Sequence, residues 1–151
     1  MDSCSNHKIC VDNALKEAEK ICQNNGARFT DIRRQILQMV WNSHRPAKAY
    51  DILDQLKKSQ SRAKPPTVYR ALDFLLENGL VHRINSINAY IGCSHPLKHT
   101  DCYFLICSTC QEISECCTDI LTKEITNIAK NAKFNFNKIN LEIEGKCQKC
   151  Q

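Results

Sequence analysis

Two cysteine pairs with the spacing Cys-x-x-Cys occur in the carboxyl-terminal half of the chain, Cys107 with Cys110 and Cys147 with Cys150. Each such turn presents two thiolates from one tight bend, and tetrahedral zinc takes four ligands of this kind at about 2.3 Å. Four thiolates leave no open coordination position, which is typical of a structural site. We therefore expect these four cysteines to bind a zinc ion that stabilises this half of the chain, rather than to remain free or form disulfides.

The expected role of the remaining cysteines depends on whether the protein is secreted or stays inside the cell. The chain has 151 residues and eleven cysteines, an odd number that rules out complete internal pairing. Its start, MDSCSNHKICVDNALKEAEK, lacks the apolar core of a signal peptide, and no apolar run reaches the ~20 residues that span a bilayer. We expect a cytoplasmic protein with no membrane partner, whose cysteines bind metal or sense redox state.

Basic residues are concentrated in one part of a chain whose net charge is +5. Residues 28–70 hold ten Lys and Arg against three acids, whereas from residue 80 onward eight bases face seven acids. This asymmetry indicates a nucleic-acid-binding unit joined to a metal-binding unit. A solvated basic surface would give the same pattern, so the charge alone does not decide between the two interpretations.

The apolar spacing of the amino-terminal half predicts helices over 12–25, 30–41, a segment around 49–56, and 67–78. Gly26 and Gly79 end the first and last of these helices, and Thr30 suits the N-cap of the second. Short β-prone runs at 80–84 and 89–92 flank a turn at 85–88. Three helices followed by a two-stranded wing form a winged helix-turn-helix.

The helix at 67–78 is the expected recognition helix, because its amino end would enter the major groove of DNA. That end carries Thr67, Tyr69 and Arg70 off the apolar stripe. Arg70 is expected to pair with guanine, unless it forms a surface ion pair with Asp73. For Tyr69, the alternative to a DNA contact is a packing role in which the ring is half-buried.

Two further side chains are candidates for DNA contact outside the amino end of that helix. Tyr50 begins the preceding helix and is expected to touch a base or a phosphate. Lys64 is a candidate for a phosphate contact, as are Arg45 and Arg62, and such contacts position a protein without reading sequence. Many winged-helix units bind proteins instead, so these assignments alone do not establish DNA binding.

The carboxyl-terminal half predicts a small α/β unit. Strands are expected at YFLIC and over 112–116, a helix over 118–132, and a last strand over 134–143. The chain is thus predicted to be α+β, with a winged-helix domain over 1–92, a hinge over 93–101, and a dimerisation and zinc-binding domain over 102–151.

A second set of metal-ligating types lies around the hinge. His82, Cys93, His99 and Glu115 supply imidazole, thiolate and carboxylate groups that zinc accepts. Spacing alone does not select them, because His95 and Cys102 are equally close competitors. Any one of these residues, such as His82 packed in the wing, could simply be structural.

The run AKPPTVYRALDFLLENGLVHR, followed by ICSTC and GKCQKC, resembles the ferric/zinc uptake regulator (Fur) superfamily, most closely its zinc uptake regulators (Zur). The resemblance extends from about Leu15 to Cys150. It implies a homodimeric, metal-dependent repressor whose winged helix binds palindromic operator DNA and whose second domain dimerises. The helix around VYRAL and the paired Cys-x-x-Cys motifs together make it specific.

Carried over by position, the resemblance implies two zinc ions per chain. One is the structural zinc of the four paired cysteines, and the other is a regulatory zinc. The family pattern assigns the regulatory ligands to four residues: His82, Cys93, His99 and Glu115. It also assigns base contacts to Tyr50 and Arg70.

The chain departs from the family pattern in one informative place. Iron-responsive members carry His-His-x-His after the hinge, where this chain has SHPLKHTDCYF. The departure argues against an iron sensor, while a shorter loop before His99 leaves His95 as a possible substitute ligand. Cys102, Cys116 and Cys117 have no family role.

The alternatives to a zinc-responsive repressor are a regulator that senses another metal and one that senses peroxide through its thiols. Cys116 with Cys117, or the amino-terminal Cys4, Cys10 and Cys22, would serve a thiol sensor. A zinc-ribbon module that binds protein rather than DNA is a further possibility. An enzyme is not expected, because zinc deaminases need His-x-Glu and Pro-Cys-x-x-Cys, and neither occurs. No small-molecule substrate is expected either.

Overall fold

The computed structural model describes residues 7–43 and 45–151, so that Cys4 lies outside the described residues. The chain divides into two compact units, Met1–Ser94 and His95–Gln151. The division falls within the stretch 93–101 that the sequence suggests as a hinge. Each unit has its own helices and strands, and each is considered by itself below.

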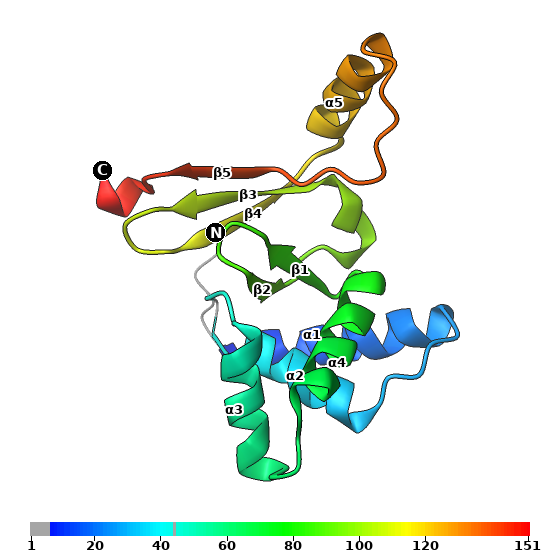
Figure 1. Ribbon diagram of the computed structural model, residues 1–151, viewed down its shortest axis with the longest axis vertical. Coiled ribbons are helices and arrows are strands. Elements are labelled where there is room, and N and C mark those ends of the chain that lie inside the picture. Colours follow the sequence, from blue (N-terminus) through cyan, green and yellow to red (C-terminus); the bar gives the residue numbers. More distant parts are fainter. Residues whose placement is uncertain (1–6, 44) are drawn as a thin grey trace. The chain divides into compact units, whose positions relative to one another are not determined.

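The first unit contains four helices followed by a β-hairpin (Figure 1). The elements are α1 (His7–Asn24), α2 (Asp31–Trp41), α3 (Ala49–Ser59), α4 (Pro65–Glu77), β1 (Val81–Ile84) and β2 (Ala89–Gly92). The two strands pair antiparallel, and Ala47 and Tyr90 exchange two backbone hydrogen bonds of 2.8 Å that widen the hairpin. This order of elements confirms the predicted winged helix-turn-helix.

Two helices begin earlier than their sequence patterns predict. Helix α1 starts at His7 rather than near residue 12, and the His7 ring lies 2.8 Å from the Asn42 carbonyl, which holds its first turn. Helix α4 starts at Pro65, where two prolines fix φ at a helical value and need no amide partner. Thr30 takes the N-cap position of α2 as predicted, but its side chain makes no capping hydrogen bond.

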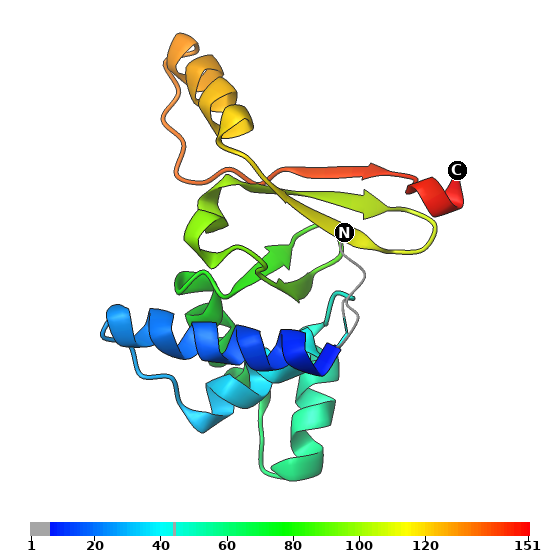
Figure 2. The ribbon, with the colours of Figure 1, turned by 180° about the vertical axis from the view of Figure 1, so that it is seen from behind.

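The predicted apolar stripes meet in one core in the first unit, which α1 crosses (Figure 2). The largest fully buried side chains come from all four helices and the wing: Cys22, Ile36, Leu37, Val40, Ile52, Leu56, Val68, Leu72, Leu75, Val81 and Ile84. Gly26 and Gly79 follow α1 and α4 with φ of 65° and 68°, a backbone conformation that favours glycine. The core fixes α4 beneath the wing and leaves the other face of α4 exposed.

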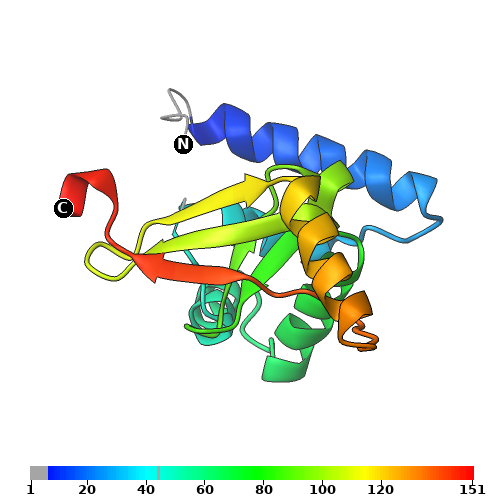
Figure 3. The same cartoon turned by 90° about the horizontal axis from the view of Figure 1, so that it is seen from above.

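The second unit is a three-stranded sheet with one long helix (Figure 3). Its elements are η1 (Pro96–Asp101), β3 (Cys102–Cys107), β4 (Ile113–Cys117), α5 (Asp119–Asn131), β5 (Glu142–Gly145) and η2 (Gln148–Cys150). The strand order is β4-β3-β5, antiparallel between β3 and β4 and parallel between β3 and β5. Thr118 caps α5 by accepting a hydrogen bond from the Ile120 amide.

The prediction of a strand over 134–143 is wrong for most of its length. Only Glu142–Gly145 form a strand, which pairs with residues 104–107 of β3. Residues 134–141 are not part of a strand, although the Leu141 carbonyl accepts a hydrogen bond of 3.0 Å from the Phe104 amide of β3. The alternating apolar side chains of this stretch are separated by asparagine and lysine, which strands disfavour. Phe134 is 64% exposed, so the alternation does not mark a buried face.

Glycine at position 92 allows a close approach between the wing and α2. A Cβ built at Gly92 would lie well inside van der Waals contact with the ring of Trp41. We expect Gly92→Ala to lower the free energy of unfolding of the first unit by about 1–3 kcal/mol through overpacking. Trp41 is the single tryptophan, so its fluorescence during urea unfolding reports the change.

Gly145→Ala is the matched control, because a Cβ at Gly145 would meet no atom within 4 Å. It should change the free energy of unfolding by less than about 0.5 kcal/mol. An unchanged midpoint in Gly92→Ala would contradict the close approach.

Candidate metal centres and nucleic-acid interface

The four paired cysteines converge because β3 and β5 are neighbouring parallel strands. Cys107 is the last residue of β3 and lies opposite Gly145, the last residue of β5. Cys110 follows in the turn after β3. Cys147 is the N-cap residue of the short helix η2 after β5, and Cys150 is the last residue of that helix. Parallel pairing therefore brings both Cys-x-x-Cys turns to one end of the sheet.

The sulfur positions suit a tetrahedral ion. All four Sγ atoms lie within 4.8 Å of one another, and the Sγ atoms of Cys110 and Cys147 are 3.7 Å apart. Zinc–sulfur bonds of about 2.3 Å place the sulfurs of a tetrahedron about 3.8 Å apart. The donor set and its spacing therefore fit zinc with no vacant position for a substrate.

Backbone amides prepare this cluster to bind a cation. Hydrogen bonding from the backbone at Cys110 and Cys147 lowers the pKa of the Cys107 thiol to about 6. The Cys147 N–H lies 3.4 Å from Cys107 Sγ. Hydrogen bonds with the neighbouring Cys147 and Cys110 thiols raise the pKa of Cys150 to about 12. A cation removes the conflict between neighbouring thiolates, so metal binding and complete deprotonation are coupled.

Two of the predicted regulatory ligands come together in the first unit. His82 lies in β1, and Cys93 immediately follows β2, with its N–H donating to the Leu80 carbonyl at 3.0 Å. The Nδ1 or Nε2 atom of His82 and the Cys93 Sγ lie within 4.8 Å of one another. Both residues are buried, and His82 is 7% exposed.

The other two predicted regulatory ligands belong to the second unit. His99 lies in η1 and Glu115 in β4, and both are half-buried. The two competing candidates, Cys102 and His95, both lie against Cys117. Cys102 forms a disulfide with Cys117, and the exposed His95 has its Nδ1 3.8 Å from Cys117 Sγ.

Sequence reasoning did not foresee the pairing of Cys102 with Cys117. The pairing depends on the register between β3 and β4, which sets these two residues opposite each other. The signal in the sequence is that Cys102 directly precedes one predicted strand, 103–107, and Cys117 directly follows the next, 112–116.

The candidate DNA-contacting side chains lie on the exposed side of α3 and α4. Tyr50, in the first turn of α3, is 60% exposed, and Tyr69 in α4 is 50% exposed. Thr67 and Arg70 lie in the first two turns of α4, and Lys64 is its N-cap residue. Half of the Tyr69 surface remains open, which leaves both a DNA contact and the half-buried packing role as interpretations of this residue.

Some basic side chains near these helices contact other protein groups, and others remain exposed. Arg34 forms an ion pair with Glu19, and the Arg33 guanidinium lies 3.5 Å from the centre of the Phe74 ring. Arg70 is exposed, and among the described residues it forms no ion pair with Asp73. Arg70 thus keeps its donors available at the amino end of α4.

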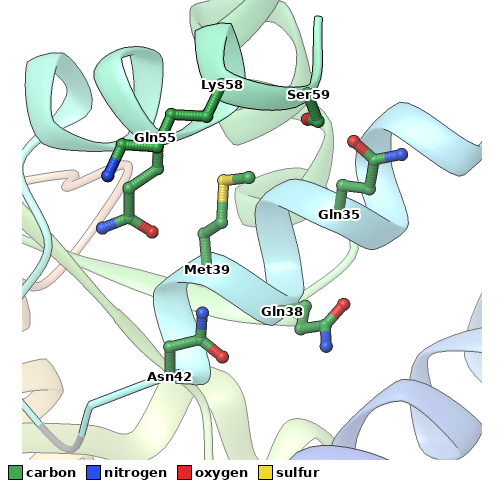
Figure 4. A pocket seen from close by; sticks show the side chains of 7 residues that line it. All are labelled: Gln35, Gln38, Met39, Asn42, Gln55, Lys58 and Ser59. Carbon is green, nitrogen blue, oxygen red and sulfur yellow. The ribbon is translucent and has the colours of Figure 1, made fainter.

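A hollow between α2 and α3 brings no catalytic chemistry (Figure 4). Its seven lining residues are Gln35, Gln38, Met39, Asn42, Gln55, Lys58 and Ser59. None of these is a cysteine, histidine or carboxylate, so the hollow offers neither a metal site nor an acid–base pair. Among the described residues, no helix combines the length and apolar character needed to cross a membrane.

Known proteins resemble the chain over almost its whole length. Residues 24–144 match the ferric uptake regulator family. The zinc uptake regulation protein of Escherichia coli K12 is 37% identical over 146 residues, covering 95% of this chain and 84% of the relative.

Solved structures agree with that match. A zinc uptake regulator complexed with zinc and DNA is 35% identical with a TM-score of 0.87, over 92% of this chain and 93% of the other. The crystal structure of holo XcZur is 36% identical with a TM-score of 0.82, over 89% and 94% of the two chains.

The four-cysteine cluster generates a prediction about metal content and folding. We expect Cys107→Ser to lose one zinc ion per chain and to unfold the second unit, since structural zinc contributes about 10–16 kcal/mol in zinc-finger peptides. Native mass spectrometry gives the zinc content, and amide hydrogen exchange locates the unfolding.

Cys116→Ser is the matched control, a half-buried cysteine of the same unit outside the cluster. It should keep this zinc ion. A Cys107→Ser protein with unchanged zinc content and unchanged exchange would disprove the site.

Proposed function

Because the chain belongs to the ferric uptake regulator family, we propose that it is a zinc-responsive transcriptional repressor of zinc uptake genes. It binds operator DNA as a homodimer in the cytoplasm when its regulatory zinc site is filled. The observation that carries this proposal is the likeness to a zinc uptake regulator complexed with zinc and DNA. Its relatives are regulators of transcription, and no enzymatic step is needed.

The proposed metal content is two zinc ions per chain. The four-cysteine cluster holds the structural ion, and its spacing supports this assignment. His82, Cys93, His99 and Glu115 hold the regulatory ion, and the closeness of His82 and Cys93 in the first unit supports half of this set. A thiolate among these ligands favours zinc over iron or manganese.

The proposed DNA contacts follow from the exposed end of α4. Entry of that end into the major groove lets Arg70 pair with a guanine and lets Thr67 and Tyr69 contact neighbouring groups. Lys64 precedes the helix and Tyr50 begins α3, where a phosphate contact would fix the register of the protein. The wing and the core hold α4 in place.

A second copy of the chain is the proposed partner of the second unit. Leu105 and Ile143 are neighbours in the β3–β5 register and are 41% and 44% exposed. Ile120 and Ile128 in α5 are each 66% exposed. Large side chains of this kind support a protein interface, and a palindromic operator requires two-fold symmetry in the protein that reads it.

To regulate DNA binding, zinc needs to change only modestly the fraction of dimers whose arrangement fits the operator. Two recognition helices must enter successive major grooves about 34 Å apart, so only some arrangements of a dimer fit an operator. The regulatory ligands come two from each unit, and a metal ion held by all four would restrict those arrangements. A 100-fold change in operator affinity needs about 2.7 kcal/mol of differential binding.

The regulatory site is tested at Cys93. We expect Cys93→Ser to lose at least about 100-fold of zinc-dependent operator affinity while the dimer stays folded, because the structural site does not involve this residue. The operator can be selected from randomised DNA with the zinc-loaded protein, and binding is then titrated against free zinc by fluorescence anisotropy.

Cys10→Ser serves as the control, since Cys10 is a partly buried cysteine of α1 in the same unit. It should respond to zinc as the unchanged chain does. Zinc-dependent binding that survives in Cys93→Ser, or a Cys93→Ser protein that unfolds, would exclude Cys93 as a purely regulatory ligand.

Base readout is tested at Arg70. We expect Arg70→Ala to weaken operator binding by about 1–3 kcal/mol and to change binding to unrelated DNA much less, because a bidentate contact to guanine carries sequence information. Lys64→Ala is the comparison variant. A phosphate contact at Lys64 should make both affinities fall together and reduce the salt dependence by about one unit. Equal losses in Arg70→Ala would refute direct readout.

A further inference from the structure

Two cysteines outside the four-cysteine cluster face each other across the sheet of the second unit. Cys102 is the first residue of β3 and Cys117 the last of β4, and the antiparallel register makes them direct partners. Their Cα atoms are 4.0 Å apart, and the structure joins them in a disulfide. Directly opposed residues on an antiparallel pair keep their side chains on one face, so the two sulfurs also remain neighbours when reduced.

Two further metal-ligating groups lie against this pair. Glu115 stands two residues before Cys117 and thus on the same face of β4, with its Oε1 3.5 Å from Cys117 Sγ. The His95 Nδ1 lies 3.8 Å from the same sulfur. The donor atoms of His95, Glu115 and Cys117 are all within 4.8 Å of one another, and those of Cys102 and Glu115 are equally close.

The segment that carries His95 is attached to the end of β4. His95 is the N-cap residue of η1, and Asp101 at the other end of η1 accepts a backbone hydrogen bond of 2.9 Å from Thr118. Thr118 directly follows Cys117. The fold therefore brings His95 back to the residues it precedes by about twenty positions in sequence, rather than leaving it on an unattached loop.

We propose that His95, Cys102, Glu115 and Cys117 bind a zinc ion when the two cysteines are reduced, and that a peroxide closes the disulfide and releases the ion. Two thiolates, one imidazole and one carboxylate match the ligands that tetrahedral zinc accepts. A disulfide sulfur has no thiolate charge, so the bound and the oxidised forms exclude each other. The disulfide is thus the metal-free form of this site.

The oxidation step balances with peroxide as the only oxidant. One thiolate attacks a peroxide oxygen, the O–O bond breaks, and the leaving hydroxide takes a proton to give a sulfenic acid and water. The second thiolate attacks that sulfur, the S–O bond breaks, and the hydroxide leaves as a second water after taking another proton. Two thiolates, one hydrogen peroxide and two protons give one disulfide and two waters.

Cys116 provides an internal comparison for this site. It lies between Glu115 and Cys117 in sequence, but strand alternation places it on the opposite face of β4, where it pairs in register with Tyr103. The interaction with Cys116 raises the pKa of Tyr103, which agrees with that placement. A thiol one position from Cys117 is thus separated from the proposed site by the sheet itself.

The proposed site uses residues of the second unit alone and goes beyond the repressor function proposed above. It shares Glu115 with the regulatory set, so in the unchanged chain the two sites compete for this carboxylate and the total stays at two zinc ions. A full-length variant with His82→Ala and Cys93→Ser lacks both regulatory ligands of the first unit, so zinc bound beyond the four-cysteine cluster then reports on the new site. The operator test at Cys93 remains a separate measurement.

The first measurement is zinc content under reducing conditions, by native mass spectrometry of that double variant loaded with zinc alone. We expect two zinc ions per chain, falling to one when Cys117→Ser is added and staying at two when Cys116→Ser is added. One zinc ion in the double variant itself, or two after Cys117→Ser, would overturn the proposal.

Because a cysteine change can disturb folding, His95→Ala supplies a second, surface variant. His95 is exposed, so its loss should leave the fold intact while raising the Kd of the second zinc ion at least tenfold against a chromophoric chelator. An unchanged Kd would remove His95 from the site and, with it, the proposed ligand set.

The last measurement adds one equivalent of hydrogen peroxide to the zinc-loaded double variant. We expect release of one zinc ion per chain together with a loss of two hydrogens that fragmentation places at Cys102 and Cys117, both reversed by a thiol reductant. Disulfide formation at this pair without zinc release, or zinc release from the four-cysteine cluster instead, would contradict the proposal.

Discussion

The pairing of β3 with both of its neighbours is the constraint on which the second unit depends. Its parallel pairing with β5 brings the two Cys-x-x-Cys turns to one end of the sheet. Its antiparallel pairing with β4 sets Cys102 opposite Cys117 at the other end. One central strand of six residues therefore positions two groups of sulfur ligands with different chemistry. The proposed zinc site of four cysteines would have no open coordination position, whereas the proposed mixed group would change its oxidation state.

The first unit uses the same principle on a smaller scale. The β1–β2 hairpin extends by one hydrogen bond beyond β2, from Cys93 to Leu80, and this extension carries the Cys93 thiol close to the ring of His82. The wing is fixed in turn by the bridge from Ala47 and by the contact between Gly92 and Trp41. The helices thus support both the exposed end of α4 and a pair of metal-ligating side chains.

Sequence patterns predicted the features that depend only on residues close together in the chain. The apolar stripes of α2 and α4, the turn at 85–88 and the stops at Gly26 and Gly79 follow from helical spacing and from glycine conformation. The strand expected over 134–143 failed because alternation cannot tell whether a partner strand is present. The Cys102–Cys117 pair was missed for the related reason that register is a property of two strands. The family resemblance, rather than spacing, suggested His99 and Glu115.

The crossover between β3 and β5 also orders the folding of the molecule. A parallel pair cannot close by a tight turn, so β5 joins β3 only after α5 and the following segment have been made. The first unit, built of neighbouring helices and a hairpin, gains most of its contacts sooner along the chain. During translation the first unit is therefore expected to fold early, while the four-cysteine cluster stays incomplete until Cys150 has left the ribosome. The proposed structural zinc would then enter that cluster as a late step of biosynthesis, after the first unit has formed.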